Sequence, residues 1–75
     1  MAKVIIEKWV EGMQKVCMTK LFRHEAGLTL PSAKQATDDI LNGKIVTIEM
    51  DSLEGATSLA EKATNLGVIC SVVED

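Results

Sequence analysis

Residues 15–34 read KVCMTKLFRHEAGLTLPSAK, and this stretch decides the fold that the sequence predicts. From Gly12 to Ala26, the apolar residues recur with the period of an amphipathic α-helix. Gly27 suits the position just after a helix, where a left-handed backbone conformation is common. Pro31 suits the first position of a second helix, because no N–H hydrogen bond is needed there. The stretch therefore predicts two helices joined by a tight turn.

Each of these helices has an apolar side that is expected to face the core. On the first helix the expected core residues are Cys17, Met18, Leu21 and Phe22. On the second helix, which is expected to stop at Asn42-Gly43, they are Ala33, Ala36, Ile40 and Leu41. The opposite arc of the first helix carries Lys15, Val16, Thr19, Lys20 and Arg23. One side of the first helix is therefore predicted to be a basic surface.

Three strands and a third helix are predicted around this helical pair. The strands are the segments rich in β-branched residues, at Lys3–Val10, Lys44–Met50 and Val68–Val73. Alternation along the first strand puts Val4, Ile6 and Val10 on one face and Trp9 on the other. The third helix has Asp51 as its expected N-cap, Glu54 three positions later, and Gly67 at its end. Its expected core stripe is Leu53, Ala56, Leu59, Ala60 and Ala63.

The order strand, helix, helix, strand, helix, strand predicts an α+β fold with a three-stranded sheet and the helices packed on one face. Residues 1–75 are expected to form a single domain. A right-handed crossover through the third helix would make the second and last strands parallel, with the first strand between them.

Composition indicates an ordinary soluble globular chain, with 47% hydrophobic and 25% charged residues. No apolar run is long enough to span a membrane, and the N-terminal residues lack a signal-peptide core, so we expect a cytoplasmic location. A domain of this size buries a limited share of its surface, which leaves a homodimer open.

Neither cysteine nor histidine forms a recognisable chemical motif. Cys17 and Cys70 match no metal-ligand or redox spacing, and we expect both to be reduced, small buried side chains. His24 has no partner for a metal site, Asp38-Asp39 is expected on a solvated helix face, and no phosphate-binding glycine loop occurs. We therefore predict a protein that is not an enzyme and has no catalytic residues, metal or cofactor.

Charge is distributed unevenly along the chain, whose net charge is −3. Residues 1–34 hold six Lys and Arg against three Asp and Glu, a net charge of +3. Residues 35–75 hold two basic against eight acidic side chains, a net charge of −6. The asymmetry predicts a surface with a basic end around the first two helices.

The basic stretch resembles the C-terminal domain of the bacterial ribosomal stalk protein, the flexible large-subunit protein that recruits translation GTPases. The motif of that family reads K-V-x-x-x-K-x-x-R-x-x-x-G-L-x-L-x-x-A-K. Nine residues match it without a gap: Lys15, Val16, Lys20, Arg23, Gly27, Leu28, Leu30, Ala33 and Lys34. Thr19 stands where the family usually has an apolar residue, and Pro31-Ser32 replaces a charged pair.

The resemblance implies a surface that contacts elongation and initiation factors. Carried over to this chain, the partner-binding residues would be Lys15, Val16, Lys20, Arg23 and Lys34, with Gly27 and Leu28 shaping the surface and Thr19 on the same arc. The main hypothesis is a non-enzymatic protein-interaction module whose basic face docks a protein partner with an acidic surface.

Three other functions stay open from the sequence. The Clp protease adaptor family shares the fold, and Gly43-Lys44, a strand and an acid-led helix resemble its second half. RNA binding is suggested by the strand-helix-helix-strand order of the KH module. However, residues 27–30 read GLTL in place of GXXG, and the acidic net charge also argues against nucleic acid. A small-molecule regulatory domain, with a pocket between two copies, is the third.

Overall fold

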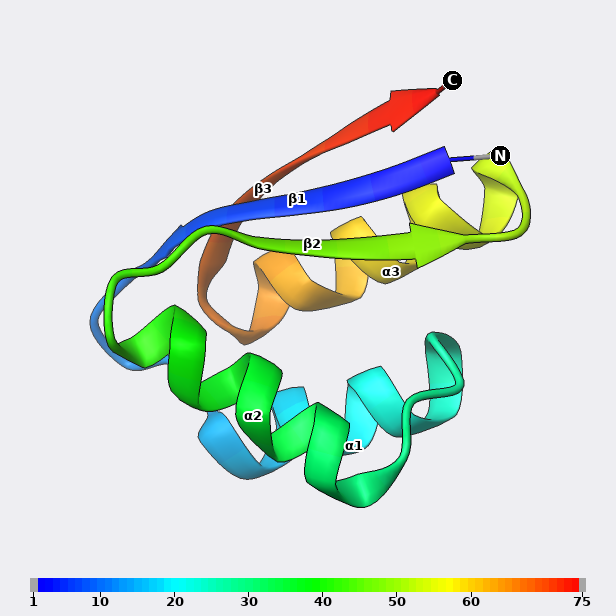
Figure 1. Ribbon diagram of the computed structural model, residues 1–75. Coiled ribbons are helices and arrows are strands. Elements are labelled where there is room, and N and C mark those ends of the chain that lie inside the picture. The colour runs from blue at the N-terminus through cyan, green and yellow to red at the C-terminus, as the bar shows by residue number, and fades with distance from the viewer. Residues whose placement is uncertain (1, 75) are drawn as a thin grey trace.

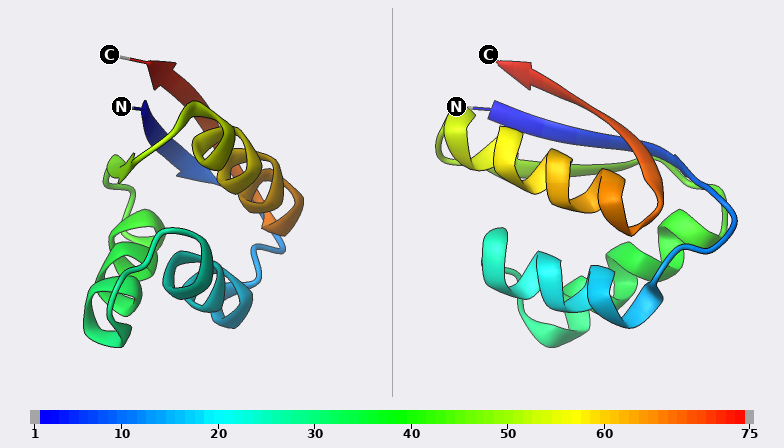
Figure 2. Two further views of the ribbon diagram at one scale, coloured as in Figure 1. Left: turned by 90° about the vertical axis from the view of Figure 1, so that its right-hand side faces the viewer. Right: turned by 180° about the vertical axis from the view of Figure 1, so that it is seen from behind.

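The computed structural model describes residues 2–74 and confirms the predicted α+β fold and order of elements (Figure 1). The strands are β1 (Ala2–Trp9), β2 (Val46–Met50) and β3 (Val68–Glu74). The helices are α1 (Lys15–Glu25), α2 (Leu30–Leu41) and α3 (Leu53–Leu66). All three helices lie on one side of the sheet (Figure 2).

β1 is the central strand of the sheet, whose order is β2-β1-β3. It is antiparallel to both neighbours, and Val4 lies opposite Ile48 of β2 and Val72 of β3. The two outer strands therefore run parallel to each other, which confirms the predicted arrangement.

The helices form two layers over the sheet. α3 packs on β1 and β3, α2 packs on β1 and β2, and α1 packs mainly against the other two helices. The core lies between the helices and the sheet. Its largest fully buried side chains are Phe22, Ile6, Met18, Ile40, Leu59, Val4, Val68 and Thr37. α1 therefore keeps one side in the core and leaves the other at the surface.

A bulge in β1 changes the faces expected for the end of that strand. Pairing with β3 jumps from Ile6 to Lys8, which leaves Glu7 without a partner in the register. After the bulge Trp9 lies opposite Val68, so it shares the helix-covered face of the sheet and not the outer face that simple alternation predicts. Val10 lies beyond the strand and is exposed.

Two helix starts differ from the sequence prediction. α1 begins at Lys15 and not at Gly12, because Gly12 has a left-handed φ of 92° that no helix residue adopts. α2 begins at Leu30, so Pro31 is its second residue, and the Thr29 hydroxyl caps it by accepting from the Ser32 N–H.

The start of α3 also differs, and so does one of its faces. The N-cap is Ser52, whose hydroxyl accepts a hydrogen bond from the Gly55 N–H at 3.0 Å, and Asp51 does not take that role. Ala56, Leu59 and Ala63 are buried as predicted, but Leu53 is 44% exposed. At 100° per residue Leu53 lies roughly 90° from the centre of this buried stripe, so it is not a core residue.

Cys17 is exposed, which corrects the prediction that both cysteines are buried; Cys70 is half-buried, and both thiols are free. The buried side of α1 is centred on Met18, Leu21 and Phe22. At 100° per residue, Cys17 lies outside that arc.

Candidate docking groove between the first two helices

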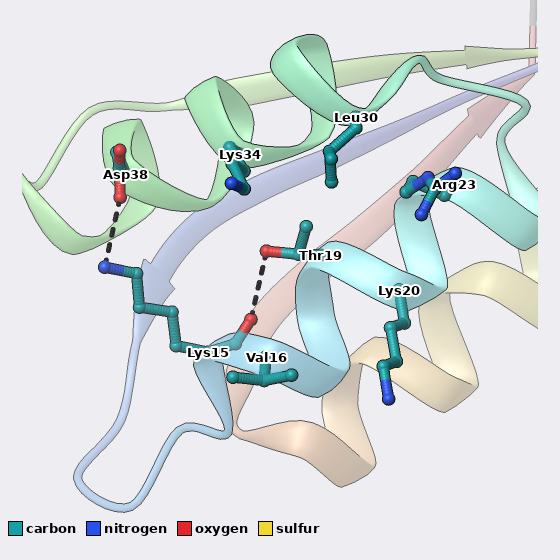
Figure 3. Close-up of a pocket in the computed structure, with 8 residues that line it drawn as sticks. All are labelled: Lys15, Val16, Thr19, Lys20, Arg23, Leu30, Lys34 and Asp38. Carbon is teal, nitrogen blue, oxygen red and sulfur yellow. Dashed lines mark hydrogen bonds and ion pairs between the residues drawn. The ribbon is translucent and has the colours of Figure 1, made fainter.

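A groove of about 420 Å³ runs between α1 and α2 (Figure 3). α1 contributes Lys15, Val16, Thr19, Lys20 and Arg23, and α2 contributes Leu30, Lys34 and Asp38. We call this feature the α1–α2 groove. Its lining mixes four cations, two apolar side chains, a hydroxyl and a carboxylate.

Helical spacing explains how these side chains meet. Lys15, Thr19 and Arg23 are each four residues apart, so they form a row along α1. Leu30, Lys34 and Asp38 form an equivalent row along α2. The rows run in opposite directions, so Lys15 lies near Asp38 at one end and Arg23 lies near Leu30 at the other (Figure 3).

The floor of the α1–α2 groove is held by two threonines. Thr19 Oγ1 lies 3.1 Å from Thr37 Oγ1 and 3.2 Å from the Lys15 carbonyl oxygen. Thr37 Oγ1, which is fully buried, lies 2.9 Å from the Ala33 carbonyl oxygen. Each threonine has one hydroxyl hydrogen, so at most two of these three contacts are hydrogen bonds at any moment. The hydrogen of Thr19 points either to the Lys15 carbonyl oxygen or to Thr37 Oγ1, and in both cases it is used inside the protein. Thr19 therefore offers a molecule in the groove an acceptor and not a donor.

Three of the four cations have no carboxylate partner within the described part of the chain. The Lys15 ammonium lies 3.4 Å from the Asp38 carboxylate, but both side chains are more than half exposed, so this ion pair contributes little to stability. Lys20, Arg23 and Lys34 form no ion pair among residues 2–74. The groove therefore keeps an excess of positive charge.

Two apolar side chains stand exposed among these cations. Val16 of α1 is 67% exposed and Leu30 of α2 is 41% exposed. An isolated exposed apolar residue is ordinary, but two on the opposing walls of one groove add an apolar surface that a partner can bury.

Most of the predicted partner-binding residues come together in this groove. Lys15, Val16, Thr19, Lys20, Arg23 and Lys34 all line it. Gly27 and Leu28 do not: Gly27, with a φ of 69°, turns the chain after α1, and the half-buried Leu28 packs against the core. Leu30 and Asp38 were not predicted as site residues. Their spacing of four residues on either side of Lys34 is the sequence signal that identifies them.

A second, shallower hollow lies on the other side of α1. It is lined by Cys17, Lys20, Leu21, His24, Glu25, Lys62 and Leu66. The Lys62 ammonium donates a hydrogen bond to the Glu25 carboxylate, which joins α3 to α1. That hydrogen bond, and the charge of Lys62, lower the pKa of the Glu25 carboxyl from its ordinary value of 4.5. Lys20 borders both hollows and points away from α2 (Figure 3).

Among the described residues, neither hollow brings metal-ligating side chains together, although Cys17, His24 and Glu25 border the second one. In the part of the chain that the structure describes, no three or more His, Cys, Asp and Glu side chains are grouped to hold a metal ion. None of the helices in residues 2–74 is both long enough and apolar enough to cross a membrane.

Comparison with known proteins leaves the family of the chain undecided. The resemblance to the stalk domain rests on the nine residues of the motif and is a hypothesis. A scan against protein-family models finds no matching family, and a search of curated proteins finds no significant match.

Proposed function

We propose that the α1–α2 groove binds an acidic, amphipathic segment of a protein partner. One observation carries the proposal: exposed Val16 and Leu30 lie on opposite walls of a groove whose Lys20, Arg23 and Lys34 form no ion pair within residues 2–74. A partner with apolar side chains flanked by carboxylates would complement both properties.

The two kinds of side chain would contribute differently to binding. Burial of Val16 and Leu30 would supply much of the affinity, since a fully buried aliphatic side chain contributes roughly 1.5–3 kcal/mol. The cations would raise the association rate and orient the partner. Each row of the groove spans nine residues of helix. Their eight rises cover roughly 12 Å, so a row matches about two turns of a partner helix.

A protein partner fits the groove better than a nucleic acid does. Recognition of single-stranded RNA relies on bases that stack on aromatic side chains or on Arg guanidinium planes, and the groove has one such guanidinium, that of Arg23. The aromatic residues of this chain are Trp9 and Phe22; Phe22 is fully buried and Trp9 lies on β1, so neither lines the groove. Asp38 would also repel a phosphate backbone.

The resemblance to the ribosomal stalk domain makes a translation factor the partner that we propose first. In that family, the positions equivalent to Lys15, Val16, Lys20, Arg23 and Lys34 contact such factors. Five of the residues that line the α1–α2 groove are therefore those that the resemblance nominates.

Affinity capture with charge-reversed chains tests this proposal. Wild type, Arg23→Glu and Lys8→Glu would be immobilised and exposed to nuclease-treated extract of the source cell and to its purified elongation factors. Lys8 is exposed on β1, outside the groove, so its reversal matches the charge change without altering the groove. We expect wild type and Lys8→Glu to retain the same partner and Arg23→Glu to lose it.

Lys34→Glu, on the opposite wall, should have the same effect as Arg23→Glu. Equal capture by wild type and both groove variants would contradict the proposal. Capture from untreated extract that is absent from nuclease-treated extract would indicate a nucleic acid as the direct ligand.

A further inference from the structure

A second surface, remote from the α1–α2 groove, lies along the free edge of β3 and the side of α3 next to it. Its residues are Ile69, Ser71 and Val73 of β3 and Leu53, Thr57 and Thr64 of α3, and we call it the β3 flank. We propose that the β3 flank binds a second copy of this chain. The two β3 strands would pair antiparallel about a two-fold axis at Ser71 and form one six-stranded sheet.

The edge of β3 is unprotected. The strand order leaves β3 with β1 as its single neighbour, so every second N–H and C=O of its seven residues points away from the sheet. Val68–Val73 contains no charged residue, proline or glycine, which are the usual means of blocking an edge, and the carboxylate of β3, Glu74, lies at the end of the strand. The opposite edge differs, because β2 has five residues, carries Glu49 and is flanked by Lys44 and Asp51.

β3 is complementary to itself in one register. A two-fold axis at Ser71 pairs all seven residues, with Val68 opposite Glu74 and Cys70 opposite Val72 of the second copy. Ile69, which is 42% exposed, then lies opposite Val73 of the second copy, which is 40% exposed, and the same pair forms again across the axis. The two exposed β-branched side chains of each copy thus cover those of the other.

The side of α3 that borders β3 is uncharged as well. The Cys70 thiol donates to the Ala60 carbonyl oxygen at 3.5 Å and lies 3.5 Å from the Thr64 hydroxyl, so this side of α3 lies beside β3. Helical spacing places Leu53 and Thr57 on the same line. In the proposed dimer the two α3 helices lie next to each other under the joined sheet, and the exposed Leu53 gains a cover.

The charge of the chain limits where a second copy can bind. Two chains of net charge −3 repel each other, so a self-contact requires a surface where like charges do not meet, and the proposed register keeps the two Glu74 side chains at opposite ends of the paired strands. In a two-fold contact, each residue pair occurs twice, once on either side of the axis. The Ile69 and Val73 pair meets this requirement, whereas the strand of a different protein would not have to. Because β3 makes no element contact with α1 or α2, the α1–α2 groove stays open in the dimer.

The size of the domain limits the strength of this contact. The described chain measures 29 × 22 × 19 Å. One flank of such a body offers on the order of 500 Å² per copy, which is below the roughly 800 Å² of a standard interface. We therefore expect a reversible dimer whose population rises with concentration.

Sedimentation equilibrium from low micromolar to millimolar concentration tests the surface. Ile69→Glu and Val73→Glu each set a carboxylate beside a β-branched side chain of the second copy, while within one chain they lie opposite Lys8 and Lys3, which favours the fold. Ile45→Glu is the matched control, because Ile45 is 68% exposed and lies outside the β3 flank. Wild type and Ile45→Glu should dimerise, whereas the two flank variants should stay monomeric with unchanged helical circular dichroism. A wild-type chain that is monomeric throughout, or flank variants that dimerise like wild type, would overturn the proposal.

Cysteine cross-linking tests the register. In a Cys17→Ser, Cys70→Ala background, Ser71→Cys should form a disulfide-linked dimer under mild oxidation, since directly opposed residues have Cα atoms about 4.5–5.5 Å apart. Ile69→Cys in the same background should not, because the two Ile69 positions are four residues out of register, or roughly 13 Å. Equally fast cross-linking of both variants would overturn the register.

Discussion

The hydroxyl oxygens of Thr19 on α1 and Thr37 on α2 lie 3.1 Å apart and join the two helices beneath the α1–α2 groove. Among residues 2–74, Thr37 is the one polar residue that is buried, and its hydroxyl also donates a hydrogen bond to the Ala33 carbonyl oxygen. The separation of the two groove walls is therefore set by a polar contact inside an otherwise apolar core.

Thr37→Val should reduce the free energy of unfolding by about 0.5–1.5 kcal/mol. The change keeps the shape of the side chain and removes its hydrogen bonds, while Thr19 can still donate to the Lys15 carbonyl oxygen. Thr37→Ala should cost more, because it also leaves a cavity. Urea denaturation of both variants would measure the difference. A loss near zero for Thr37→Val beside a large loss for Thr37→Ala would show that packing and not the hydroxyl decides this site.

Leu59→Ala should destabilise the domain by about 2–5 kcal/mol, the usual cost of truncating a fully buried leucine. Leu53→Ala is the matched control on the same helix, and its cost should stay near about 0.5 kcal/mol because Leu53 is exposed. Thermal unfolding at low protein concentration would compare the two without a contribution from self-association. Similar losses at both positions would contradict the observed face of α3.

Ser52→Ala should lower stability by about 0.5–2 kcal/mol, because it removes the acceptor for the Gly55 N–H at the start of α3. Asp51→Ala should change stability by no more than about 0.5 kcal/mol, since Asp51 is exposed and does not cap the helix. Chemical denaturation distinguishes the two. A larger loss for Asp51→Ala would restore the cap that the sequence suggested.

The Glu25–Lys62 ion pair should make stability depend on pH below about 4.5. Because the folded-state pKa of Glu25 is lowered, the pair stabilises the protein above the unfolded-state pKa of this carboxyl. That stability is lost as pH falls through the folded-state pKa. The difference in stability between wild type and Glu25→Gln should therefore be largest at neutral pH and shrink in acid. A difference that is constant from neutral pH into acid would show that the ion pair is not formed.

Val16→Ala should weaken capture of the groove partner without affecting the fold. Val16 is 67% exposed, so stability should change by no more than about 0.5 kcal/mol. The loss should appear mainly in the dissociation rate, because apolar contact does not steer the encounter. Ile45→Ala is the control, since Ile45 is equally exposed outside the groove. Identical dissociation rates for the two variants would exclude Val16 from the contact.

Much of the fold could be predicted because the spacing of apolar residues differs between helices and strands, and because glycine and proline mark several ends of these elements. The αα pair around Gly27, the stripe of α3 and the strand β2 each follow from local pattern. The bulge at Glu7 could not be predicted, because it depends on how β1 pairs with β3 and no residue pattern within β1 indicates it. The same holds for Leu53, which lies at the border of the α3 stripe, where the packing of the helix decides which side chains are covered.

The groove was predictable for the charged row of α1 and less so for its other wall. Lys15, Thr19 and Arg23 share one face of a single helix, so spacing alone groups them. Leu30 and Asp38 join them through the packing of α2 on α1, which the Thr19–Thr37 contact fixes. A buried threonine has no distinct sequence pattern, so neither the polar floor nor the position of the second wall could be derived.

The central place of β1 in the sheet has a consequence during synthesis. Its residues leave the ribosome before those of β3, yet Ala2 pairs with Glu74 and Val4 with Val72. These contacts span nearly the whole sequence, so β1 can pair with β2 once residues 46–50 have emerged, but its other edge must wait until β3 has been translated. The nascent chain can therefore form helices as it emerges, but it completes its sheet only after residues 68–74 have left the exit tunnel.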